Sequence, residues 1–122
     1  MGYRSEVAYV IKFEDIAQRD AFVTLVLAKN DPIVTEAIND TTHDQTDDPV
    51  ITFKAGDVKW YDSYPDVQVH HQMMRDATEL YDAEWRFVRI GEETTDIEVQ
   101  EEGHEFELWE YVDPVSSIRT SF

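Results

Sequence analysis

The sequence contains no cysteine among its 122 residues. A disulfide framework, a catalytic thiolate and a zinc site built on cysteine are therefore excluded. Glycine and proline are scarce, with four of each, and neither a glycine-rich phosphate loop nor a hydrolase or zinc-protease motif is present. No apolar run approaches the ~20 residues of a membrane span, and no secretory signal opens the chain. These absences predict a cytoplasmic protein without a metal or another cofactor.

Basic side chains are also few. Ten lysines and arginines stand against 27 acids, which gives a formal net charge of −17. Nucleic acids and anionic membranes both require a basic face, so we expect direct binding to neither. Two interpretations of the charge remain open. It keeps the protein dispersed in solution, or it binds a partner that has a basic surface.

Apolar residues are plentiful enough for one core. They make up 42% of the chain, and aromatic residues make up 12%. A chain of this length forms one domain and buries about two-thirds of its unfolded surface. We therefore predict a single domain over residues 1–122, with residues 114–122 as a short C-terminal tail.

The hydrophobic periodicity predicts the order of the elements. Residues 5–13 are apolar on both faces, which is typical of a central strand. The predicted elements are a strand at 5–13, a helix at 16–30, a short helix at 32–38 that Asp31 caps, a hairpin of strands at 50–54 and 58–61, a second main helix at 64–81, and strands at 85–90, 96–100 and 105–112. This order predicts an α+β fold, a two-layer sandwich of a mostly antiparallel sheet and two main helices, with a split βαβ arrangement of the ferredoxin-like kind.

The first candidate site lies where the predicted strand at 58–61 runs into the helix at 64–81. Ser63 and Asp66 have the spacing of a capping box at the start of that helix. Aromatic, acidic and imidazole side chains converge at this corner: Trp60, Tyr61, Tyr64, Asp66, His70 and His71. His70 and His71 are adjacent in a helix and point about 100° apart, so they do not share a metal easily. Asp66, one turn before His70, is placed to orient it. The corner is either a core hinge or the pocket of a small ligand-binding domain or hydrolase.

The second candidate site is an acidic segment. Residues 92–113 contain ten acids and no lysine or arginine. On a strand, acids two residues apart lie ~6.6–6.8 Å from one another on one face, a spacing comparable to that of phosphates along a nucleic-acid strand. The predicted partner-binding face consists of Glu98, Glu105, Glu107, Trp109, Glu110 and Tyr111. Arg86 and Arg89 face opposite sides of their strand, and one of them is expected to pair with this segment. The alternative is a water-exposed sheet face with no partner.

Three segments carry a resemblance. They are Met1-Gly2-Tyr3-Arg4-Ser5-Glu6-Val7, the central Val58-Lys59-Trp60-Tyr61-Asp62-Ser63-Tyr64-Pro65-Asp66-Val67-Gln68, and Phe87-Val88-Arg89-Ile90-Gly91-Glu92 followed by Asp96-Ile97-Glu98. The chain resembles a group of small uncharacterised proteins of tailed bacteriophages, which has no assigned activity. The resemblance implies expression in the cytoplasm of a bacterial host, where small acidic phage proteins often inhibit host enzymes, some by imitating DNA.

The leading hypothesis is therefore a non-enzymatic interaction protein. Its acidic face is predicted to bind a basic host protein that handles nucleic acid, as an inhibitor or DNA mimic. The alternatives are the ligand-binding domain or hydrolase at the corner, and a structural phage component that would form a symmetric oligomer.

Overall fold

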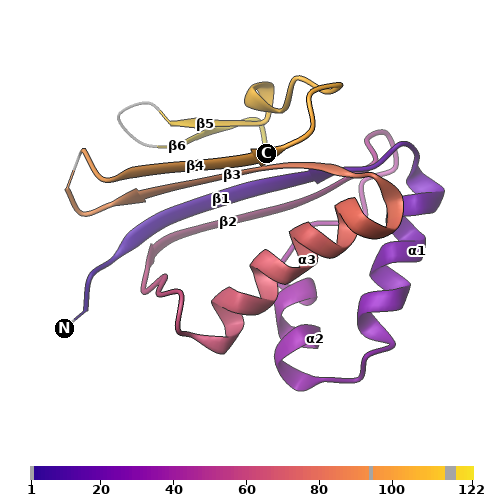
Figure 1. Cartoon of the computed structure of the whole chain (residues 1–122), viewed down its shortest axis with the longest axis horizontal. Helices are drawn as coiled ribbons and strands as arrows, with labels where there is room; N and C mark the ends of the chain where they lie inside the picture. The colour runs from indigo at the N-terminus through magenta and orange to yellow at the C-terminus, as the bar shows by residue number, and fades with distance from the viewer. Residues whose placement is uncertain (1, 94, 115–117) are drawn as a thin grey trace.

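The computed structural model describes residues 2–93, 95–114 and 118–122. The elements follow the order β1 (Ser5–Lys12), α1 (Ile16–Leu27), α2 (Pro32–Asn39), β2 (Val50–Val58), α3 (Pro65–Tyr81), β3 (Glu84–Gly91), β4 (Ile97–Glu102), a 3-10 helix η1 (Leu108–Glu110), β5 (Val112–Pro114) and β6 (Ile118–Thr120). Figure 1 shows the main sheet with α1, α2 and α3 all on one of its faces. The predicted α+β class and the sandwich of helices on an antiparallel sheet are confirmed.

The main sheet has the strand order β2-β1-β3-β4, and every neighbouring pair is antiparallel. Since β2 and β3 both run antiparallel to β1, they are parallel to each other, and α3 connects them across β1. This is the predicted split βαβ unit. The ferredoxin-like fold has two such units, whereas here α1 and α2 connect β1 to its direct neighbour β2.

Two hydrophobic cores lie on opposite faces of the sheet. The first, under the helices, contains Tyr9, Phe22 and Phe87, and the second contains Val10, Val88 and Leu108. The second core is covered by η1 and by the small sheet of β5 and β6 (Figure 1). Because β1 contributes alternate residues to both cores, the prediction of a central strand is confirmed.

Side chains mark where the first two helices begin. Asp15 accepts a hydrogen bond from the backbone N–H of Gln18, and Asp31 accepts from Ile33 and Val34. The predicted capping box at α3 is wrong. Tyr64 is the N-cap of α3, and its side chain makes no capping hydrogen bond.

The predicted hairpin at 50–61 is also wrong, because β2 continues to Val58. Ser5 lies opposite Val58 and Val7 lies opposite Ala55, so β2 has one residue more than β1 in this interval. Asp57 has a φ of 55°. Gly56 and Asp57 therefore form a β-bulge, which needs the same backbone freedom as a turn.

The predicted strand at 105–112 is replaced by a turn, η1 and the start of β5. Gly103 has a φ of 93°, and the Glu84 carboxylate accepts the backbone N–H groups of Glu105 and Phe106, each at 2.9 Å. These contacts turn the chain across the second face of the sheet. Leu108 then enters the second core, where it is 4% exposed.

The predicted C-terminal tail at 114–122 contains β6, which pairs with β5. Ile118 is 6% exposed, and its N–H donates to Glu6 on β1. Residues 115–117 of that predicted tail lie outside the described residues.

Candidate functional site

Trp60 is the centre of the aromatic corner between β2 and α3. Its ring centroid lies 5.9 Å from Phe53, 5.4 Å from His70 and 6.1 Å from Phe87. The corner thus closes one end of the first core, as the core-hinge interpretation predicts. Its outer side chains border solvent, so the corner is not entirely core.

His70 belongs to the buried part of the corner. It is 4% exposed, and its Nδ1 lies 2.7 Å from the hydroxyl of Tyr9. Burial lowers the pKa of His70 to about 4 and raises the pKa of Tyr9 above its ordinary value. The histidine is therefore neutral at pH 7, and one hydrogen bond joins its Nδ1 to the Tyr9 hydroxyl. Tyr9 orients His70. Asp66, the predicted orienting group, makes no hydrogen bond with His70 in the described part of the chain, although the two residues line the same hollow of about 270 Å³.

His71 points to a different hollow, as the predicted divergence of the two histidines requires. Its Nε2 lies 3.4 Å from the indole nitrogen of Trp60, which can only donate. Burial lowers the pKa of His71 too. The hollow has a volume of about 270 Å³, and its polar lining includes Arg75, Glu98 and Gln100. The hollow therefore lies between α3 and β4, and a neutral histidine forms part of its wall.

The two tyrosines of the corner lie on its outer side. The Tyr61 hydroxyl accepts the backbone N–H of Tyr3 at 2.6 Å, and its ring packs edge-on against Tyr64 with the centroids 5.0 Å apart. Trp60 and Tyr61 line a second hollow of about 290 Å³, which shares Asp62 and Glu98 with the His71 hollow. The two hollows thus adjoin along β4.

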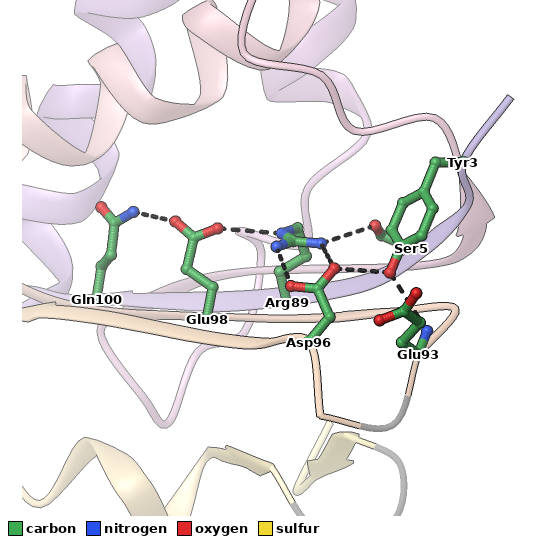
Figure 2. A network of polar contacts seen from close by, with 7 residues as sticks. All are labelled: Tyr3, Ser5, Arg89, Glu93, Asp96, Glu98 and Gln100. Atoms are coloured by element: carbon green, nitrogen blue, oxygen red, sulfur yellow. Dashed lines mark hydrogen bonds and ion pairs between the residues drawn. The ribbon is translucent and has the colours of Figure 1, made fainter.

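Glu98 lies on the helix-covered side of β4, in the polar network that Figure 2 shows. Arg89 bonds Glu98 at 3.0 Å, Asp96 at 2.9 Å and the Ser5 hydroxyl at 3.2 Å. The Tyr3 hydroxyl donates to Asp96 at 2.7 Å. The hydrogen bond from Arg89, followed by that from Tyr3, lowers the pKa of Asp96. The negative charge of this part of the acidic segment is therefore partly neutralised.

Arg86 neutralises another part of the acidic segment from the opposite face. It bonds Glu101 at 2.8 Å and Asp113 at 2.9 Å. Both arginines of β3 thus pair with the segment, where one was predicted. Across the described residues, six of the ten basic side chains form ion pairs within the protein: Lys12, Arg19, Lys29, Arg86, Arg89 and Arg119.

The other predicted acids do not share a sheet face with Glu98. Glu105 and Glu107 lie in the turn before η1, and Glu110 lies within η1. All three are exposed, and Trp109 beside them is 51% exposed. Tyr111 is held inward, because its hydroxyl bonds Lys12 and Asp48, each at 2.7 Å. The predicted acidic sheet face, formed by strands at 96–100 and 105–112, is therefore wrong, although three of its acids remain close together in the chain.

Glu105 contributes to a hollow of about 450 Å³ at the end of the sheet where β3 begins. The other acids in its lining are Glu14, which precedes α1, Asp82, which follows α3, and Glu84, the first residue of β3. No basic residue is among its described lining residues. Four acids and no base thus line the hollow among the described residues.

The sequence did not indicate this hollow, since its acids are far apart in the chain and only the fold unites them. Gln100 was also missed, although its spacing from Glu98 was a usable signal, because residues two apart on a strand share a face.

No family model, curated protein or solved structure matches the chain. Within the described residues, no helix has the length and apolar character needed to cross a membrane. The same residues contain no group of three or more histidine or acidic side chains placed to hold a metal ion.

Proposed function

We propose that this chain is a small acidic interaction protein that binds a basic surface of another protein. The observation that carries the proposal is the hollow that contains Glu105, because four acids and no base line it among the described residues. Its volume, about 450 Å³, accommodates a lysine or arginine side chain. Glu107 and Glu110 are exposed and close to Glu105 in the chain.

The distribution of the basic residues supports the same function. Most of them are engaged in ion pairs inside the protein, so they do not offset the exposed acids of residues 102–110. Like charges gathered on one surface destabilise a protein that has no partner, and a basic partner relieves that repulsion. Proteins that handle nucleic acid carry large basic surfaces and are the partner class we propose. The phage resemblance implies that such a partner belongs to the cytoplasm of a bacterial host.

The proposed imitation of DNA does not rest on a row of phosphate-like carboxylates. Asp96 and Glu98 are paired with Arg89, and Glu105 and Glu107 are not on a strand. The proposal therefore relies on a local negative hollow that receives basic side chains.

The test compares two double charge reversals in a capture experiment from nuclease-treated bacterial lysate. Glu105→Lys with Glu107→Lys alters the proposed surface, and Asp44→Lys with Asp47→Lys makes the same change of net charge in an exposed loop elsewhere. We expect the wild type and the loop variant to retain one basic protein that elutes at moderate salt. The first variant should bind that protein at least about tenfold more weakly. Equal binding by all three proteins, or equal loss in both variants, would contradict a local site.

A second function is favoured by the adjoining hollows at the corner. His71 is neutral, half-buried and surrounded by Arg75, Glu98 and Gln100. This arrangement suits a small polar ligand or a hydrolytic substrate, with His71 as the base. A screen of polar metabolites by histidine NMR tests it. A ligand that shifts the His71 resonances in the wild type but does not bind a Gln100→Leu variant would support it, and no shift with any compound would contradict it.

A further inference from the structure

The outer edge of β4 is open. β4 is the last strand of the sheet order, and no other strand lies beyond it among the described residues. An open edge presents unpaired backbone N–H and C=O groups, which can pair with an extended segment of another chain.

Two backbone hydrogen bonds show which residues of β4 direct their backbone groups toward this edge. Gly91 donates its N–H to the carbonyl of Asp96 at 2.8 Å, so Asp96 directs its backbone toward β3. The N–H of Ile97 instead bonds Thr95 at 3.1 Å. In an antiparallel pair this direction alternates along the strand. The N–H and C=O groups of Val99 therefore face outward.

The same alternation directs the backbone of Glu101 outward and the backbones of Glu98 and Gln100 toward β3. An incoming strand thus finds two outward residues in succession, Val99 and Glu101. Each of them offers one donor and one acceptor.

The side chains of β4 give this edge two different faces. Ile97 and Val99 are 43% and 42% exposed and lie on the side of the second core, opposite Ile90 and Val88. Glu98 and Gln100 lie on the other side, next to the His71 hollow. A strand that alternates apolar and basic side chains matches both faces.

Charge decides which chain can occupy the edge. Two copies of this protein each carry a net charge of −17, and pairing β4 with itself would bring glutamates opposite one another. We propose that β4 accepts an extended basic segment of a partner protein as a fifth strand of the sheet. This inference rests on the proposed function for the charge of the partner and adds the way in which the partner is bound.

The experiment measures the binding of a fluorescent, end-capped peptide that alternates lysine and valine. Val99→Pro removes an outward N–H without touching the pairing with β3 or the charge of the protein. We expect this variant to bind the peptide about tenfold more weakly than the wild type. A fully N-methylated peptide of the same charge should bind the wild type as weakly.

A matched variant separates this inference from the proposed function. Glu105→Lys with Glu107→Lys leaves β4 intact. If that variant loses the peptide while Val99→Pro retains it, the fifth strand is wrong and the acidic hollow stands. The opposite pattern supports the fifth strand and contradicts the hollow, and no binding by the wild type overturns the fifth strand.

Hydrogen exchange of the backbone amides in the wild type provides a second measurement. It tests whether the peptide pairs with β4 even if Val99→Pro does not fold. Saturating peptide should slow exchange at the amides of Val99 and Glu101 about tenfold or more. Unchanged exchange at both amides in the presence of bound peptide would overturn the proposal.

Discussion

Glu84 should hold the segment before η1 in place through its two backbone contacts. Glu84 is 6% exposed, and its carboxylate accepts the N–H groups of Glu105 and Phe106, each at 2.9 Å. In Glu84→Gln, one oxygen becomes an NH₂ group, which meets an N–H donor. One charge-assisted hydrogen bond is lost, at a cost of about 2 kcal/mol of unfolding free energy. For a domain of this size, the melting temperature should fall by about 6–10 °C.

Urea unfolding is the appropriate assay, because guanidinium is a salt and would screen the high net charge. Glu102→Gln is the matched control. It removes the same charge from an exposed side chain and should change the unfolding free energy by less than about 0.5 kcal/mol. If Glu84→Gln is as stable as Glu102→Gln, the two contacts of the Glu84 carboxylate do not stabilise the turn at residues 103–107.

Three further predictions concern the turn, the second core and the buried histidine. Gly103→Ala should lower the unfolding free energy by at least about 1 kcal/mol in the same urea assay, because its φ is 93° and a Cβ would collide with the Glu84 side chain. Leu108→Ala should cost about 2–4 kcal/mol in urea, and a cost below about 1 kcal/mol would show that the second core contributes little. The pKa of His70 is about 4 in the folded protein, below its ordinary value, so its stabilising effect is complete above about pH 6.5 and is lost as the pH falls toward 4. Between pH 7 and pH 5, the unfolding free energy of the wild type should therefore fall by about 2 kcal/mol more than that of His70→Gln. Parallel profiles of unfolding free energy against pH would contradict the low pKa.

The sequence predicted the elements whose cause is local. Residues 7–11 are apolar at every position, which identifies a central strand without knowledge of its neighbours. Asp31 followed by Pro32 identified the start of α2, because a capping acid and a residue without an N–H suit the first helical turn. The α+β class followed from the order of such elements.

The failures came from contacts between distant residues. Gly56 and Asp57 allow a turn or a bulge equally well, and the pairing of β2 with β1 selects the bulge. Phe106 and Leu108 alternate as they would in a strand, but Glu84, about twenty residues earlier, turns the chain. These choices depend on tertiary structure, which local propensity does not contain.

The acidic face was mispredicted for a related reason. Residues 92–113 contain no lysine or arginine, but the arginines that neutralise some of their acids lie on the neighbouring strand β3. The register places Arg89 opposite Glu98 and Arg86 opposite Glu101. Aligning the two strands as a hairpin would have revealed both pairs from the sequence, since opposite charges across a sheet are favourable partners. The hollow around Glu105 had no such local signal.

The burial of β1 on both faces bears on how this protein can evolve. Every residue from Val7 to Ile11 is 0% exposed, so no position there admits a charged replacement, whichever way it points. Ala8 has the smallest side chain of these residues, and a larger one would displace Val88, its cross-strand partner. Natural variants should therefore diverge last in β1, and changes at Ala8 should be accompanied by compensating changes at Val88. The exposed positions of β4 and residues 43–47 should diverge first.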